Sequence, residues 1–223
     1  MVPRIAEIIG SAGTGKTTLC HALIRCNRSI HMSNFPDVRK ISAAPFFILN
    51  GLKLSSTLLG LSQSNSRRLT RREFAWLSIL NGWPSILKKE SKDNKVIILD
   101  QGPVYLLTET SEFGPKYLKR QNAQGFWRGL YSRWAVMLDM IIWLDAVDTD
   151  LIKRIRSRDK DHVVKDESVD TTLEFLARYR KAYERTISNL SANHSGLKVF
   201  RFDTSQQSTD EIVNTLVFEF GLT

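Results

Sequence analysis

The chain has few cysteines and no long apolar run. Its 223 residues include two cysteines, Cys20 and Cys26, which are spaced too widely for a CxxC redox pair. We therefore expect free thiols in a reducing, cytoplasmic setting. No run approaches the roughly 20 apolar residues of a membrane span, so no stable membrane insertion is expected. A cleavable signal would remove the apolar segment that begins at Ile5, so export is not expected either.

Acidic side chains are also in short supply. Asp and Glu number 23 against 32 Lys and Arg, which gives a formal net charge of +9. This excess favours anionic partners, among them nucleotides, phosphorylated substrates, nucleic acid and acidic membrane surfaces. The sequence shows no cluster with metal-ligand spacing and no arrangement of nucleophile, histidine and acid. Neither a dedicated metal centre nor triad hydrolysis is therefore indicated.

What the sequence does contain is an apolar segment, Ile5–Ile9, that leads into G-x-x-x-x-G-K-T, the Walker A phosphate loop. The glycines allow backbone N–H groups to wrap a phosphate at the start of a helix near Lys16. Lys16 is expected to reach the β- and γ-phosphates, and the Thr17 hydroxyl to bind Mg²⁺. The residues expected to contact ATP or GTP are Gly10, Ser11, Ala12, Gly13, Thr14, Gly15, Lys16, Thr17 and Thr18.

A second marker is the apolar run 96–99, which ends in Asp100. This pattern fits a Walker B strand, whose carboxylate holds Mg²⁺ through water or accepts a proton from an attacking hydroxyl. Apolar strands also end in Asp where the residue caps a turn, and that structural reading stays open.

A third marker is Asp145, followed by a basic segment that contains Arg154 and Arg158. At helical spacing these arginines share a face, where they would stabilise charge on a transferring phosphoryl group. The alternative is a solvated helix end, because acidic residues of the same segment balance its charge. Residues 154–170 are interpreted as a lid.

Strand-like and helix-like patterns alternate along the chain. This alternation predicts a single three-layer α/β domain over residues 1–223, with a parallel sheet of about five strands and helices on both faces. The expected strands are Ile5–Ile9, Ser29–Met32, Val96–Leu99, Met140–Leu144 and Val199–Phe202. The expected helices are Lys16–Asn27, Arg71–Lys89, Phe126–Leu138, Thr149–Arg158, Thr171–Asn193 and Thr209–Phe220.

Taken in order, these markers resemble the P-loop nucleoside and nucleotide kinases, with a layout similar to thymidylate kinase and the deoxynucleoside kinases. The matching segments are 10–18, 96–102, 141–160, 174–187 and 199–213. The resemblance implies an arginine-bearing lid, a catalytic role for Asp100 and a last loop that packs on adenine. It also implies an acceptor-binding segment near Asp37 and Arg39, although an ordinary turn explains these two residues equally well.

One position departs from the family. Thymidylate kinases carry Asp-Arg after the third strand and deoxynucleoside kinases carry Glu-Arg-Ser, whereas this chain has Asp100-Gln101. A neutral Gln101 cannot form a charged bidentate clamp on phosphate. A monophosphate acceptor would therefore need another arginine, such as Arg39 or Arg72.

Residues 44–72 form an insertion on the expected acceptor side. Its apolar part is interpreted first as core packing or as a cover for the acceptor pocket. The interface with a second subunit of a homodimer and a contact with a membrane surface stay open as alternatives. The basic cluster Arg67, Arg68, Arg71 and Arg72 either binds a polyanion or forms a solvated loop.

The sequence thus predicts an ATP- or GTP- and Mg²⁺-dependent phosphotransferase that acts on a small hydroxyl or phosphate acceptor, most similar to a nucleoside or nucleotide. One alternative is a polynucleotide 5′-hydroxyl kinase or another enzyme acting on nucleic acid. A second alternative is a nucleotide-dependent regulatory ATPase that uses no acceptor.

Overall fold

One parallel sheet forms the centre of the protein. The computed structural model describes residues 5–62, 66–91, 96–159 and 161–222. The strands are β1 (Ile5–Ile9), β2 (Ile30–Ser33), β3 (Val96–Asp100), β4 (Met140–Asp145) and β5 (Lys198–Asp203). Their order across the sheet is β2-β3-β1-β4-β5, and every neighbouring pair is parallel. This confirms the expected fold class, and it brings the carboxyl ends of all five strands to one edge.

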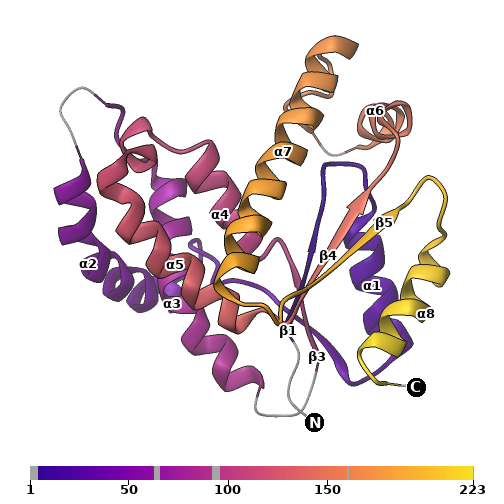
Figure 1. The fold of residues 1–223 in the computed structure, drawn as a ribbon, viewed down its shortest axis with the longest axis horizontal. Helices are drawn as coiled ribbons and strands as arrows, with labels where there is room; N and C mark the ends of the chain where they lie inside the picture. Colours follow the sequence, from indigo (N-terminus) through magenta and orange to yellow (C-terminus); the bar gives the residue numbers. More distant parts are fainter. Residues whose placement is uncertain (1–4, 63–65, 92–95, 160, 223) are drawn as a thin grey trace.

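Helices cover both faces of the sheet (Figure 1). They are α1 (Lys16–Cys26), α2 (Ala44–Leu61), α3 (Arg71–Glu90), α4 (Pro103–Glu112), α5 (Gln124–Met137), α6 (Asp148–Ser157), α7 (Val169–Asn193) and α8 (Thr209–Glu219). The six helices expected from the sequence are all present. The segment 44–72 contains α2 and ends in the first turn of α3.

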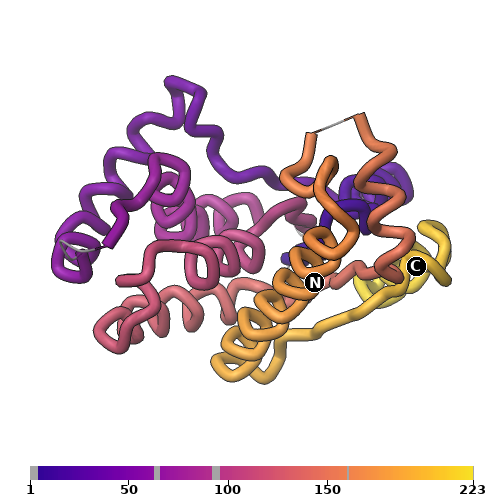
Figure 2. The backbone as a smooth tube through the Cα atoms, turned by 90° about the horizontal axis from the view of Figure 1, so that it is seen from above, coloured from indigo at the N-terminus to yellow at the C-terminus, as the bar shows by residue number. Residues whose placement is uncertain are grey.

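Strand side chains alternate between two apolar layers, as the pleat of a sheet requires. In β1, Ile5 and Ile9 pack with the helices α3, α4, α5 and α7. Ala6 and Ile8 point to the other face and pack with α1 and α8. Seen from above, α7 crosses the molecule between α2–α5 and the pair α1 and α8 (Figure 2). The phosphate-loop edge of the sheet therefore lies beside both α6 and the amino-terminal half of α7 (Figure 1).

Local sequence explains where α3, which packs against both α2 and α4, begins and how it accommodates an internal proline. Thr70 accepts a hydrogen bond from the Glu73 backbone N–H, and Glu73 accepts one from the Thr70 N–H, which forms a capping box. Pro84 lies inside the helix and cannot donate to the carbonyl of Leu80. The Trp134 indole N–H donates to that carbonyl at 3.0 Å. A side chain of α5 thus satisfies the acceptor that the proline leaves open.

Candidate active site

The turn between β1 and α1 is a tight loop whose glycines are needed for its shape. Gly10, Gly13 and Gly15 have φ angles of 144°, 86° and 87°, which side chains rarely allow. A Cβ on Gly10 would lie 2.2 Å from the Leu144 carbonyl oxygen, because the loop closes on the end of β4. Thr14 Oγ1 fixes the turn by donating to the Ser11 carbonyl at 2.9 Å.

Lys16 is the first residue of α1, and its ammonium group is folded into this loop. Nζ donates to the carbonyls of Gly10 at 2.7 Å and Ser11 at 2.8 Å. Burial lowers the pKa of Lys16 to about 8; Asp100 opposes this shift and Arg158 adds to it. The loop therefore holds a cation at the place where backbone N–H groups and a helix N-terminus also favour an anion.

Thr17 and Asp100 meet beside Lys16. Thr17 Oγ1 donates to Asp100 Oδ2 at 3.0 Å across 83 residues of sequence. The contact arises because β3 pairs with β1, with Asp100 opposite Ile8, so both chain segments leave the sheet at the same edge. A hydroxyl and a carboxylate oxygen fit Mg²⁺, which binds one or two protein oxygens and keeps phosphate and water for its other positions.

Sequence reasoning missed Glu7, which lies in the middle of β1. Its side chain is fully buried and accepts three backbone N–H bonds, from Gly102 at 2.9 Å, Val104 at 2.6 Å and Tyr105 at 2.9 Å. Glu7 therefore caps the start of α4. Burial raises the pKa of Glu7 to about 8, against the three hydrogen bonds, which lower it. The signal that would have revealed it is a lone charge in an otherwise apolar strand.

The turn that Glu7 holds contains Asp100. Gln101 has φ 66°, the one positive φ among the non-glycine residues that the structure describes. A Cβ on Gly102 would lie 2.7 Å from the Glu7 carboxylate, so glycine is required there. The positive φ of Gln101 costs free energy and persists only where the surrounding structure fixes it. Here Glu7 supplies that support, and the turn in return fixes where the Asp100 carboxylate leaves the sheet.

The two lid arginines do not share a helix face. The sequence predicted a helix through Arg158, but α6 ends at Ser157 and Arg158 continues in extended backbone. Arg154 donates to Thr204 Oγ1 at 2.9 Å, to the Thr204 carbonyl at 3.0 Å and to the Gly13 carbonyl at 3.4 Å. It joins the phosphate loop to the loop after β5, whereas Arg158 is close enough to Lys16 to lower the pKa of that residue.

Residues after Arg158 fold back towards the phosphate loop. Lys165 Nζ donates to the Arg158 carbonyl at 2.7 Å. His162 packs its ring against Phe175 of α7. Burial lowers the pKa of His162, and the charges of Arg158 and Lys16 lower it further. A neutral imidazole thus lies within electrostatic reach of two cations at the phosphate site.

Two solved kinase structures are similar to the chain over nearly its full length. Deoxyadenosine kinase from M. mycoides with bound dATP shares 18% identity, with 98% of this chain and 99% of that chain covered and a TM-score of 0.50. Thymidylate kinase from Candida albicans shares 14% identity, with 99% and 92% covered and a TM-score of 0.57. The chain has the nucleoside and nucleotide kinase fold. No protein-family model matches the chain, and no curated protein matches it.

Within this kinase fold, the expected acceptor-side residues are not gathered at one point. Asp37 and Arg39 are exposed after β2, and Asp37 Oδ1 accepts from the Arg39 backbone N–H at 2.9 Å. That contact is an ordinary Asx turn. Gln101 is exposed in the turn beside Asp100.

Arg72 belongs to a cluster between α3, α4 and α7 of the kinase fold. Its guanidinium lies 4.4 Å from the ring centre of Trp76. Burial raises the pKa of Tyr105, and Arg72 opposes that shift. Glu109 accepts from the Tyr179 hydroxyl at 2.6 Å. Burial raises the pKa of Glu109, while Tyr179 and Arg72 lower it. We call this set of five residues the Arg72–Glu109 cluster.

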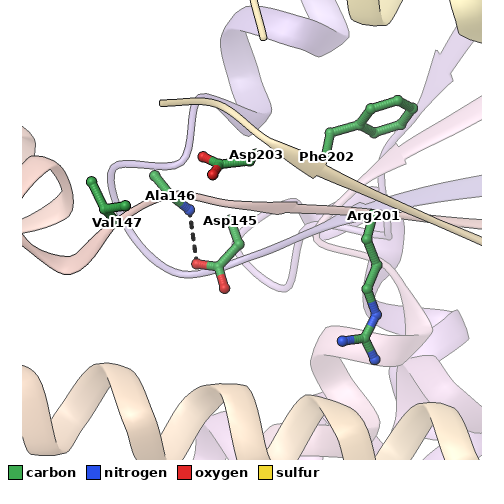
Figure 3. Close-up of a pocket in the computed structure, with 6 residues that line it drawn as sticks. All are labelled: Asp145, Ala146, Val147, Arg201, Phe202 and Asp203. Atoms are coloured by element: carbon green, nitrogen blue, oxygen red, sulfur yellow. Dashed lines mark hydrogen bonds between the residues drawn. The ribbon is translucent and has the colours of Figure 1, made fainter. Parts of the chain in front are cut away.

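A hollow of about 340 Å³ lies between the ends of β4 and β5 (Figure 3). Its lining residues are Asp145, Ala146, Val147, Arg201, Phe202 and Asp203. Arg180 of α7 pairs with Asp145 at 2.8 Å and with Asp148 at 2.6 Å, which ties β4, α6 and α7 together. The Thr204 that Arg154 contacts also donates to the Asp145 carbonyl, at 2.8 Å from its backbone N–H.

Proposed function

We propose that the protein is a phosphotransferase that moves the γ-phosphoryl group of ATP or GTP to a small nucleoside- or nucleotide-like acceptor. The observation that carries the proposal is the meeting of Thr17 Oγ1 and Asp100 Oδ2 beside Lys16 in a glycine-fixed loop. The fold supports it, since neighbours of the same fold are a deoxyadenosine kinase with bound dATP and a thymidylate kinase.

In this proposal Lys16 leaves the carbonyls of Gly10 and Ser11 and binds oxygens of the β- and γ-phosphates instead. The loop N–H groups and the start of α1 hold the same phosphates. Thr17 and Asp100 hold Mg²⁺, Asp100 through water; when bound, the ion offsets phosphate charge. Arg158 adds positive charge where the transferring group becomes most anionic, and Arg154 fixes the loop on which this geometry depends.

With a hydroxyl as acceptor the chemical step needs one proton acceptor, whereas an ionised phosphate oxygen needs none. As the acceptor oxygen bonds to the γ-phosphorus, its proton passes to Asp100 and the bond between the γ-phosphorus and the bridging oxygen breaks. The nucleoside diphosphate leaves with that oxygen. Closing residues 154–170 over the site would exclude water and so limit hydrolysis of the triphosphate.

The chemical class of the acceptor is inferred from the residues on the side of the site that α3 and α4 form. Gln101 provides no charge for a phosphate, and Arg39 is exposed in the turn after β2. Arg72 is the cation that remains, and Glu109 and Tyr179 beside it supply hydrogen-bonding groups for hydroxyls or a base. We therefore favour a nucleoside hydroxyl, or a monophosphate that is bound through Arg72.

The test is turnover of ATP with Mg²⁺ against separate pools of nucleosides, nucleoside monophosphates, sugars and 5′-hydroxyl oligonucleotides, with products read by mass spectrometry. One nucleoside or nucleotide that gains a single phosphate supports the proposal. Phosphorylated oligonucleotides would move the acceptor to nucleic acid. Hydrolysis of ATP that no pool accelerates would instead support the regulatory ATPase.

A further inference from the structure

Helix α2 presents apolar side chains on two opposite faces. One face, with Leu54, Leu58 and Leu61, is buried against α3. The other carries Ile48, Leu52 and Leu59, which are 62%, 68% and 74% exposed, and Ile41 in the preceding turn is 91% exposed. These four exposed positions fall at helical spacing on one stripe. Large apolar side chains that are exposed along one side of a helix indicate an interaction surface.

Contacts with α3 fix how α2 lies. A Cβ on Gly51 would come within 2.9 Å of Phe74, and one on Gly82 within 2.3 Å of Asn50, so the two helices approach closely. Asn81 donates to Asn50 at 2.9 Å across the same interface. By length and composition, Ile41–Leu61 resembles a membrane span, but crossing a bilayer would break this packing. The stripe is therefore available only to a partner that meets α2 side-on.

The charged residues in the segment of the chain that carries the stripe have a single sign. No acidic residue occurs between Asp37 and Glu73, while seven basic residues do: Arg39, Lys40, Lys53, Arg67, Arg68, Arg71 and Arg72. Arg67 pairs with Glu73, and Arg72 stacks on Trp76. Lys53, Arg68 and Arg71 are exposed, and within the described part of the chain none of them forms an ion pair.

This charge pattern distinguishes between partners. A twofold dimer through α2 would bring two such basic surfaces together, and like charges at an interface oppose association. An anionic bilayer offers an apolar medium to the exposed side chains of the stripe. It also offers negative charge to the basic residues of the same segment. In Figure 1, α2 lies at the end of the molecule away from α1 and α8, so docking there leaves the phosphate loop accessible.

We propose that α2 and its basic flanks, residues 38–62 and 66–72, dock the protein side-on to the surface of an anionic lipid bilayer. Ile41, Ile48, Leu52 and Leu59 enter the boundary between headgroups and acyl chains, and Lys53, Arg68 and Arg71 contact lipid phosphates. The orientation places the acceptor side of the molecule next to the membrane, because α2 packs on α3.

The experiment is sedimentation of the full chain with vesicles of phosphatidylcholine alone, or with 30% phosphatidylglycerol. The apolar variant is Ile48→Ser/Leu52→Ser/Leu59→Ser, and its control, Val136→Ser/Val169→Ser/Phe218→Ser, removes exposed apolar residues elsewhere. The basic variant is Lys53→Gln/Arg68→Gln/Arg71→Gln. Its control, Arg25→Gln/Arg128→Gln/Lys181→Gln, removes the same charge from other exposed positions.

We expect binding to the phosphatidylglycerol vesicles only, and less of it at high salt. At about fivefold per basic residue, the basic variant loses roughly 100-fold in affinity. The apolar variant loses at least about tenfold, and both controls stay near wild type. Far-UV circular dichroism and light-scattering mass are measured on every variant. The proposal is overturned if the wild type does not sediment, if the controls lose as much as the variants, or if the apolar variant changes a dimer into a monomer.

Discussion

Lys16 shows how one residue joins the loop, the helix and the candidate chemistry. Its Nζ bonds two carbonyls of the loop that it would leave on binding phosphate, and its pKa is lowered to about 8 by burial. Two predictions belong to this residue, since its charge and its protonation can be tested separately.

Replacing Lys16 with Met keeps the length of the side chain and removes the ammonium. We expect turnover of ATP to fall by roughly 10²–10³ or more, because a charge aimed at the developing phosphoryl charge is lost. Steady-state assay with the identified acceptor measures this. Lys153→Met, an exposed change on α6, is the control and should keep near-normal activity. Normal turnover in Lys16→Met would remove the assignment of this residue.

Protonation of Lys16 predicts how nucleotide binding depends on pH. With a pKa of about 8 in the free protein, Lys16 is largely neutral at pH 9, while bound phosphates favour its charged form. Binding at pH 9 should therefore take up close to one proton, and affinity should decrease as pH rises above 8. Titration calorimetry in buffers of different ionisation enthalpy measures the uptake. Lys16→Met should show none.

Glu7 holds the turn that follows Asp100 through three backbone hydrogen bonds, and it gives the third prediction. In Glu7→Gln, an amide NH₂ faces the Val104 N–H in place of an accepting oxygen, so two donors oppose each other. We expect a loss of about 1–3 kcal/mol in the free energy of unfolding. Urea unfolding at pH 9, where a group with a pKa of about 8 is mostly ionised, measures this loss. The exposed substitution Glu174→Gln should change little, and an equally stable Glu7→Gln would show that the three bonds contribute nothing net.

At the scale of elements, α6 and the residues after it place two arginines differently. Arg154 bonds the phosphate loop and Thr204, whereas Arg158 lies beyond the helix end and near Lys16. Within this arginine-rich segment, Arg154 therefore holds a loop and Arg158 supplies positive charge.

Steady-state kinetics of variants distinguishes the roles of Arg154 and Arg158. Arg154→Lys keeps the charge but cannot form three contacts, so we expect KM for the nucleotide to rise more than kcat falls. Arg158→Ala should lower kcat by about 10² with a smaller change in KM, because it removes charge that acts in the transition state. Arg156→Ala, which among the described residues loses a bond to the Glu167 carbonyl, is the control. Indistinguishable effects of the first two variants would contradict this division.

At the scale of the molecule, the candidate site joins segments from both halves of the chain. The phosphate loop, the turn after β3 and the loop after β5 meet at one sheet edge. Thr17 bonds Asp100 there, and Arg154 of α6 joins the phosphate loop to Thr204. A ligand that bridges these segments should stabilise the whole fold.

Thermal unfolding tests this coupling. Mg²⁺ and a nucleotide at 100 times the dissociation constant should add about 2.7 kcal/mol, which raises Tm by roughly 5–10 °C in a protein of this size. Asp100→Asn should keep the effect of nucleotide alone and lose most of the increment from Mg²⁺. A Tm that does not move with any nucleotide would count against a nucleotide site.

Sequence periodicity was enough to predict the five strands and the helices α1, α3, α5, α6, α7 and α8, while the roles of the candidate site residues stay predictions. Apolar runs bounded by turn residues report local structure, and the glycine spacing of the loop reports a backbone shape. Three features were not accessible in this way: the role of Glu7, the end of α6 before Arg158, and the pairing of Trp134 with the carbonyl that Pro84 leaves open.

These features depend on partners that are distant in the sequence. Glu7 caps the turn after β3 because β1 lies beside that strand. The turn brings three backbone N–H groups to the buried Glu7 carboxyl group. The exposed stripe of α2 is apolar in sequence just as its buried face is, and only packing on α3 decides which face stays free. Local propensity thus determined the elements and the loop, and tertiary structure decided which polar groups meet and which surfaces remain, because burial and hydrogen bonding are properties of the assembled layers.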